Sequence, residues 1–397
     1  MTALHAPGAR VAIAGGSLAG LSAARTLRAE GFDGELTIVG AEPHLPYERP
    51  ALSKAALGGA VAPAELAVSL ALDLGDLDAT WRLGTRAAAL DLGARELRLD
   101  GGERLAYDGL VVATGAAPRA LPGCEVPVHR LRTLEDAAAL NAALATGGRL
   151  AIVGGGFIGC EVAAGARARG LDVTVIEGAA APLAAPLGAA VAHALAARLR
   201  ALGVELRCGR GVSAVSEAGV TLDDGTLLEA DHVLVAIGAS PATGWLAGSG
   251  LVCRDGVVCD SECATAGSRV VAAGDVARWW HPGCGRRVRV EHWEHAELHG
   301  AAAARRLLHG PRGVPFAPVP FVASELGPHV LHLAGWPRGG LELLDGALDD
   351  GPFAAAWVDG PHVSGVVALD SPRAFRRLRR RLDGGLAAAD LHAAAAA

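Results

Sequence analysis

The first forty residues alternate between short apolar runs and one longer segment with helical spacing. The run RVAIA at 10–14 leads into the turn GGSLAG at 15–20, the segment LSAARTLRAEG at 21–31 and the run ELTIVG at 35–40. A short apolar run between turn residues is typical of a strand buried on both faces, as in a parallel sheet. The order therefore predicts a strand, a glycine turn, a helix and a second strand, which together form one βαβ unit.

This unit carries the features of a dinucleotide-binding fingerprint. Gly15 permits the tight turn, Gly20 lets the helix lie close to the strand, and the acidic residue Glu42 follows the second strand. The helix N-terminus presents free N–H groups to a pyrophosphate. Ser17 stands where the fingerprint has its middle glycine, so the turn departs slightly from the pattern.

The same order of elements returns later in the chain. RLAIVG at 149–154 leads into GGGFIG at 154–159, a helix expected at 161–169, the strand DVTVIE at 172–177 and its final acid, Glu177. The first copy's closing motif LDGGERLAYDGLVVATG recurs as LDDGTLLEADHVLVAIG, 123 residues on. All three fingerprint glycines are present in this copy, namely Gly154, Gly156 and Gly159. The sequence thus predicts two dinucleotide-binding units built alike, with a boundary near residue 120.

Two dinucleotide sites in one chain indicate a flavin and a nicotinamide, because a reduced nicotinamide delivers hydride to a flavin. Glu177 favours NADH over NADPH, since a carboxylate accepts a hydrogen bond from a ribose 2′-hydroxyl and repels a 2′-phosphate. No arginine follows Glu177 directly. NADPH remains the alternative.

Composition limits the classes of function. The 397 residues are 51% hydrophobic and 20% charged, and the net charge is −6, which is typical of a globular protein and argues against nucleic-acid binding. No apolar run approaches the roughly 18 residues of a membrane span and no secretory leader is evident, so we expect a cytoplasmic location. The seven cysteines include no CxxC pair, which favours free thiols.

Lys54 is the only lysine beside 35 arginines. Arginine is planar, bulky and permanently charged, so a retained lysine indicates a position that needs a compact ammonium on a flexible stem. A solvated lysine placed by chance is the alternative.

Several motifs together resemble one enzyme family. They are GGSLAGLSAARTLRAEG, VGAEPHLPYERPALSK, ATGAAPR, GGGFIGCEVAAGARARGLDVTVIE, GDVARWW and VRVEHWEHA, and they cover about residues 10–300. The chain resembles the FAD-dependent NADH:ferredoxin reductases of bacterial oxygenase systems, the family that includes putidaredoxin reductase and the biphenyl-dioxygenase reductase. This group belongs to the pyridine nucleotide-disulfide oxidoreductases but lacks their redox disulfide.

The resemblance implies a site for each cofactor. The residues implied to line FAD are Gly15, Ser17, Gly20, Glu42, Arg49, Lys54, Thr114, Gly115, Arg119, Asp275 and Trp293. Those expected to hold NADH are Gly154, Gly156, Ile158, Gly159, Glu177 and Gly238. The resemblance also implies that Lys54 lies near flavin N5 and pairs with Glu161, an acid expected in the first turn of the second unit's helix. Trp293 is implied to pack by the isoalloxazine, so Lys54, Glu161 and Trp293 are the candidate catalytic residues.

Three segments need separate interpretation. His292, His295 and His299 could share one helix face, but no second ligand motif accompanies them and we expect no metal. Six arginines between Arg373 and Arg381 either steer an acidic ferredoxin or form a solvated helix face. In PFVASEL at 320–326, Ala323 stands where the resembled family commonly has tryptophan, which puts the flavin lining and the electron acceptor in doubt.

The predicted fold is α/β, with two nested Rossmann-like domains and a smaller α+β C-terminal domain. The expected limits are 1–120 with 245–317 for FAD, 121–244 for NAD and 318–397 for the C-terminal domain. The predicted function is electron transfer from NADH through FAD to a ferredoxin of a monooxygenase or Rieske dioxygenase, by a monomer or weak homodimer with no nucleic-acid or membrane partner. The alternatives are a flavoenzyme acting on a small organic substrate and an NADH-sensing flavoprotein related to apoptosis-inducing factor.

Overall fold

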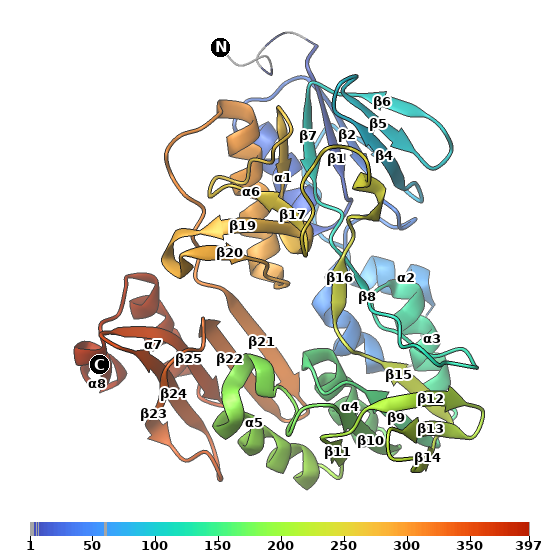
Figure 1. Ribbon diagram of the computed structural model, residues 1–397, viewed down its shortest axis with the longest axis vertical. Coiled ribbons are helices and arrows are strands. Elements are labelled where there is room, and N and C mark those ends of the chain that lie inside the picture. Colours follow the sequence, from blue (N-terminus) through green and yellow to red (C-terminus); the bar gives the residue numbers. More distant parts are fainter. Residues whose placement is uncertain (1–3, 5, 7, 59–61, 397) are drawn as a thin grey trace. The chain divides into compact units, whose positions relative to one another are not determined.

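The computed structural model describes residues 4, 6, 8–58 and 62–396. Their backbone forms two compact units, each assembled from segments that are distant in sequence (Figure 1). Unit 1 consists of Met1–Glu48, Ala67–Ala117 and Ala239–Pro318. Unit 2 consists of Arg49–Leu66, Pro118–Gly238 and Val319–Ala397.

Unit 1 is built on a five-stranded sheet. Its strands are ordered β18 (Val270–Ala272), β7 (Gly109–Val112), β1 (Arg10–Ala14), β2 (Glu35–Val39) and β3 (Thr80–Arg82), and all its pairings are parallel. Every residue of β7 and β18 is buried, as the uninterrupted apolar runs predict. Helices α1 (Leu18–Ala29) and α6 (Trp293–His309) pack against each other and share one apolar core with this sheet.

Smaller elements complete unit 1. One small sheet consists of β4 (Ala87–Asp91), β5 (Glu96–Leu99) and β6 (Arg104–Ala106). A second small sheet consists of β17 (Val257–Cys259), β19 (Ala277–His281) and β20 (Arg286–Val288). Short helical turns are η4 (Gly244–Leu246), η5 (Gly274–Val276) and η6 (Pro282–Cys284). Strands β8 (Ala116–Pro118) and β16 (Ala239–Pro241) pair where the chain passes between the units. Helix α2 (Pro63–Ser69) lies at another such passage.

Unit 2 repeats the parallel arrangement. Its sheet has the order β11 (Glu205–Cys208), β10 (Asp172–Glu177), β9 (Arg149–Val153) and β15 (His232–Val235), again parallel throughout. The helices of this part are α3 (Leu134–Ala145), α4 (Phe157–Ala168) and α5 (Ala184–Ala201). An antiparallel sheet of β12 (Val212–Ser216), β13 (Gly219–Leu222) and β14 (Leu227–Glu229) precedes β15 in the chain. The inserted segment contributes η2 (Arg49–Ser53) and η3 (Ala55–Gly58).

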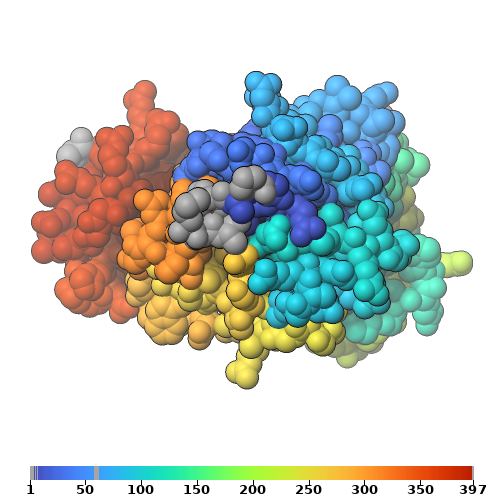
Figure 2. Space-filling model, turned by 90° about the horizontal axis from the view of Figure 1, so that it is seen from above, coloured from blue at the N-terminus to red at the C-terminus, as the bar shows by residue number. Residues whose placement is uncertain are grey.

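The C-terminal segment forms an antiparallel sheet with helices beside it. In the space-filling view its residues, drawn in red, gather in one part of the surface (Figure 2). The strand order is β21 (Phe321–Leu326), β22 (His329–Gly335), β25 (His362–Leu369), β24 (Phe353–Asp359) and β23 (Gly340–Gly346). Helix α7 (Pro372–Asp383) buries its apolar side chains against the sheet core, and η7 (Ala388–Asp390) and α8 (Leu391–Ala396) follow.

The predicted fold class is confirmed, with two parallel sheets of the dinucleotide-binding type and a smaller α+β segment. The three domain limits given by the sequence stay a prediction, and the structure adds that Arg49–Leu66 belongs to unit 2. The helices that follow the two glycine turns, α1 and α4, begin earlier than expected, at Leu18 and Phe157 instead of residues 21 and 161. The physical reason is that Gly20 and Gly159 lie within the first helical turn. Glu161 consequently lies beyond the first turn of α4, so the helix N-terminus does not stabilise its charge.

Candidate functional site

The first glycine turn is shaped by two contacts that leave no room for a side chain. Gly15 has a φ of +129°, and a Cβ there would lie 2.0 Å from the carbonyl oxygen of Ala113 at the end of β7. A Cβ on Gly20 would lie 1.9 Å from the carbonyl oxygen of Gly15. The turn is therefore clamped between the strand and its own helix. Ser17 is the N-cap residue of α1, whose described first turn contains no acidic side chain that would compete with a phosphate.

Four of the predicted FAD residues follow the carboxyl ends of parallel strands in unit 1. Gly15 follows β1, Glu42 follows β2, Thr114 follows β7 and Asp275 follows β18. Because the strands are parallel, these residues meet at one edge of the sheet, where ligands bind in doubly wound folds. The structure thus brings them together, with Gly115 next to Thr114 and with Trp293 as the first residue of α6, which contacts η5.

Neighbouring groups hold two of these residues in place. Tyr47, which is 4% exposed, donates a hydrogen bond from its hydroxyl to Glu42 Oε2 at 2.5 Å. Thr114 donates from Oγ1 to the carbonyl oxygen of Ala242 at 2.9 Å. The sequence prediction missed Tyr47, although it stands in the same PYERPALSK segment as Arg49 and Lys54.

The second glycine turn in unit 2 has the same construction. A Cβ on Gly154, whose φ is +107°, would lie 2.5 Å from the carbonyl oxygen of Ala236. A Cβ on Gly159 would lie 2.1 Å from the carbonyl oxygen of Gly154. Ala236 corresponds to Ala113 in the repeated closing motif, so the duplication seen in the sequence extends to the contacts that form the turn. Gly156 is the N-cap residue of α4, and Ile158 in its first turn is 40% exposed.

Glu177 at the end of β10 is already oriented by the backbone. Its Oε2 accepts a hydrogen bond from Gly155 N at 2.7 Å and its Oε1 from Ala179 N at 2.7 Å. Gly154, Glu177 and Gly238 all lie at the carboxyl ends of parallel strands of the second sheet. Two further predicted FAD residues, Arg49 and Arg119, belong to unit 2 and not to the unit that holds the first glycine turn.

The single lysine forms an ion pair with Glu161. Lys54 Nζ lies 3.3 Å from Glu161 Oε1, and the two side chains are 18% and 6% exposed. Both residues belong to unit 2, because the segment that carries Lys54 joins the unit of α4. Arg169 Nη1 helps to hold that segment by donating to the carbonyl oxygen of Leu57 at 2.9 Å. The alternative of a freely solvated lysine does not describe this side chain.

Glu161 also accepts hydrogen bonds that the sequence did not reveal. Ser324 Oγ on β21 donates to Oε1 at 2.7 Å, and the backbone N–H of Glu325 donates to the same oxygen at 3.3 Å. Ser53 donates from Oγ to Oε2. A signal for Ser53 was its place beside Lys54, whereas nothing in the sequence links Ser324 to an acid 163 positions earlier.

The three histidines do not share an exposed helix face. His292 is the N-cap residue of α6, and His295 and His299 are 3% and 0% exposed. The ring of His295 stacks on Trp279 at 4.6 Å between centroids, and that of His299 stacks on Phe316 at 4.5 Å. Burial lowers the pKa of His299 to about 3, so the ring is neutral. No three metal-ligating side chains gather closely enough to hold a metal within the described residues.

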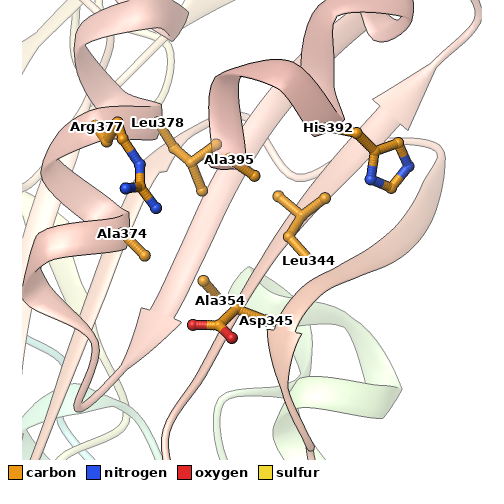
Figure 3. A pocket seen from close by; sticks show the side chains of 8 residues that line it. All are labelled: Leu344, Asp345, Ala354, Ala374, Arg377, Leu378, His392 and Ala395. Carbon is orange, nitrogen blue, oxygen red and sulfur yellow. The ribbon is translucent and has the colours of Figure 1, made fainter. Parts of the chain in front are cut away.

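A separate cavity of about 320 Å³ lies in the C-terminal segment between α7, α8, β23 and β24 (Figure 3). None of the predicted cofactor residues lines it. Its lining consists of Leu344, Asp345, Ala354, Ala374, Arg377, Leu378, His392 and Ala395.

In the described part of the chain, no helix is long and apolar enough to cross a bilayer.

Comparison with known proteins agrees with this construction. The sequence pattern of the pyridine nucleotide-disulphide oxidoreductase family matches residues 9–300. The chain is 38% identical to the ferredoxin reductase component of chlorobenzene dioxygenase from Cupriavidus sp. (strain PS12), over 94% of this chain and 92% of that protein. It is 36% identical to the ferredoxin–NAD(+) reductase subunit of the benzene 1,2-dioxygenase system of Pseudomonas putida, with the same coverage.

A solved structure extends the likeness to the whole fold. The crystal structure of the covalent putidaredoxin reductase–putidaredoxin complex matches 96% of this chain and 94% of that chain, with a TM-score of 0.88 and 30% sequence identity. The match thus includes the C-terminal segment beyond residue 300. On the evidence of the duplicated turns, the sequence pattern and these relatives, the chain belongs to the pyridine nucleotide-disulphide oxidoreductase family.

Proposed function

We propose that the protein is an FAD-dependent NADH:ferredoxin reductase. It takes electrons from NADH and supplies them singly to an iron–sulfur protein that serves a monooxygenase or a Rieske dioxygenase. The observation that carries the proposal is the pair of clamped glycine turns, each followed by an acid at the carboxyl edge of its own parallel sheet. The relatives that match nearly the whole chain are reductase components of the same kind.

The residues of unit 1 fit FAD. A Cβ at Gly15 or Gly20 would fill the space that lets the backbone turn close to a pyrophosphate, and the α1 N-terminus offers N–H donors to it. Glu42, with its position fixed by Tyr47, binds the ribose, and Asp275 binds the ribityl hydroxyls. His292 Nδ1 is a buried nitrogen without a hydrogen-bond partner among the described residues, so unit 1 retains polar capacity for a ligand. When bound, FAD accepts a hydride from NADH and releases its electrons one at a time.

The residues of the second turn fit NADH. The backbone N–H groups of Gly155 and Ala179 hold the Glu177 carboxylate so that it faces the turn, where it accepts a hydrogen bond from a ribose hydroxyl. A 2′-phosphate would meet this negative charge. No arginine side chain bonds to Glu177 within the described residues. This arrangement supports NADH as the donor.

Lys54 is proposed as the cation that acts on the flavin, and Trp293 as the aromatic residue that packs by the isoalloxazine. An ammonium near the flavin ring stabilises the negative charge that reduction places there. Glu161 is the counter-charge that lets the ammonium stay in a largely buried position. Arg49 and Arg119 remain proposed FAD contacts.

The basic helix α7 is the proposed docking element for an acidic ferredoxin. The structure divides its six arginines. Arg377 lines the cavity of Figure 3, and Arg379 lies over the Phe321 ring at 4.2 Å. The four exposed guanidinium groups form no ion pair with any described residue; they are Arg373, Arg376, Arg380 and Arg381. Unpaired cations on a protein of net charge −6 favour steering of an acidic partner over a neutralised surface.

Purification and turnover test the function. The protein should be yellow, should bleach when NADH is added anaerobically, and should reduce cytochrome c rapidly only when a ferredoxin is present. A colourless protein that takes up no FAD would refute the proposal. Rapid turnover of a small organic substrate without ferredoxin, or a long-lived complex with NADH that reoxidises slowly, would refute the ferredoxin step.

Since NADH is a cytoplasmic reductant, we also propose the cytoplasm as the place of action.

A further inference from the structure

The Glu161 carboxylate is the meeting point of three segments of unit 2. It extends from α4, receives Lys54 and Ser53 from the segment of η2, and receives Ser324 and Glu325 from β21. A carboxylate offers about four acceptor positions, two on each oxygen. Three of the donors meet Oε1 and one, the Ser53 hydroxyl, meets Oε2. The Glu161 side chain is only 6% exposed, so the loss of one donor leaves its charge less well solvated.

Three of the four donors are neutral, and this changes what the ion pair does. A lysine stem is flexible, so the position of its ammonium depends on where its counter-charge is held. If Lys54 were the only partner, carboxylate and ammonium would move together. Because the Ser324 hydroxyl and the Glu325 N–H group fix the carboxylate independently of Lys54, Glu161 is a stationary anchor to which Lys54 binds.

Ser324 is the best placed of these donors to act as the fixed point. Ser53 precedes Lys54 in the chain and moves with it. Ser324 is 1% exposed and lies in the middle of β21, where it pairs with Leu331 of β22. Its 2.7 Å hydrogen bond is also shorter than the 3.3 Å separations from Lys54 Nζ and Glu325 N to the same oxygen.

We propose that Ser324 is a positioning residue for Lys54, acting through Glu161. The Ser324 hydroxyl on the C-terminal sheet fixes the Glu161 carboxylate, and the carboxylate in turn determines the position of the Lys54 ammonium, the only lysine side chain of the protein. The consequence for catalysis rests on the proposed function, in which that ammonium stabilises the reduced flavin. The positioning itself involves residues of unit 2 alone.

The single lysine provides a direct readout that needs no turnover. In protein labelled with ¹⁵N at lysine Nζ, the spectrum contains one side-chain ammonium signal, from Lys54. We expect Ser324→Ala to shift this signal and to speed proton exchange at the ammonium. The matched control is Ser364→Ala on β25, since among the described residues that hydroxyl bonds only to backbone groups of Arg338 and Trp357. An unchanged signal in Ser324→Ala, or an equal shift in Ser364→Ala, would overturn the proposal.

Rapid-mixing kinetics test the link to catalysis. We expect Ser324→Ala to keep its FAD content and to be reduced by NADH about tenfold more slowly, a change of about 1.4 kcal/mol in the barrier. In a Lys54→Met background the same substitution should have no further effect, because Ser324 acts through Lys54. An equal slowing in both backgrounds would contradict the inference. Ser324→Cys, which keeps the shape of the side chain and replaces the hydroxyl by a weak thiol donor, serves as the second variant if Ser324→Ala does not fold.

The two proposals fail in different ways. A protein that holds no FAD would refute the proposed function, while the lysine spectrum would still decide the role of Ser324. A protein that binds FAD and accepts electrons from NADH, but whose ammonium signal ignores Ser324, would refute only the positioning role.

Discussion

The two glycine turns predict reciprocal losses of binding. We consider Gly20→Ala in unit 1 and Gly159→Ala in unit 2, which add one methyl group at equivalent places. The new Cβ would lie 1.9 Å from Gly15 O in the first case and 2.1 Å from Gly154 O in the second. Since carbon and oxygen approach to about 3.3 Å at the closest, each turn must shift by roughly 1.3 Å.

The magnitude follows from what that shift breaks. Overpacking of this kind costs about 1–3 kcal/mol of folding stability. Moving the turn also withdraws N–H donors from a pyrophosphate, and a hydrogen bond to a charged group contributes about 1.5–3 kcal/mol. The loss of one such bond raises the dissociation constant by about 10- to 100-fold. Gly20→Ala should therefore weaken FAD and spare NADH, whereas Gly159→Ala should do the reverse.

The assay compares FAD content by absorbance with NADH affinity by titration, and uses circular dichroism to verify folding. Gly165→Ala is the control, because Gly165 lies in the same helix as Gly159 and a Cβ there meets nothing within 4 Å. That variant should bind both nucleotides normally and gain up to about 1 kcal/mol of helix stability. The assignment of FAD to unit 1 would be refuted if folded Gly20→Ala kept its FAD or lost both nucleotides equally.

Three further outcomes are expected. Burial lowers the pKa of His299 to about 3 from 6.5, so the unfolded chain binds more protons than the folded protein between these pH values. The free energy of unfolding should therefore fall as the pH drops below about 6.5, by up to about 1.4 kcal/mol per pH unit. In denaturant titrations, His299→Phe should flatten this dependence. Replacing Glu177 by alanine together with Gly178→Arg should shift preference from NADH toward NADPH by about tenfold or more in steady-state kinetics, and an unchanged ratio would contradict the role of the carboxylate. Reversing charge with Arg376→Glu and Arg380→Glu should slow ferredoxin-dependent cytochrome c reduction about tenfold at low salt and leave ferricyanide reduction unchanged, whereas equal rates would identify a merely solvated face.

The parts that the sequence predicted well are those determined locally. The glycine turns and the strands before them form within a few residues, so a run such as RVAIAGG specifies its own structure. The helix starts were placed three or four residues late because the tight packing of Gly20 and Gly159 against the turn depends on contacts that a sequence pattern does not display.

The parts that the sequence did not predict depend on distant partners. Ser324 meets Glu161 across 163 positions, and neither residue belongs to a motif containing the other. The helical spacing of His295 and His299 indicates a shared face but not that Trp279 and Phe316 cover it. That face is therefore a packing surface of the core.

The interleaving of the two units has a consequence for how the chain must fold. The chain passes between the units five times, after Glu48, Leu66, Ala117, Gly238 and Pro318. Strand β7 receives its outer neighbour β18 only after the whole Pro118–Gly238 segment has been synthesised. Closing so long a loop is slow on the folding timescale, and the open edge of β7 must wait for it on the ribosome. Neither unit can be excised as a continuous gene fragment, so a library of truncations should yield soluble protein only from nearly full-length chains.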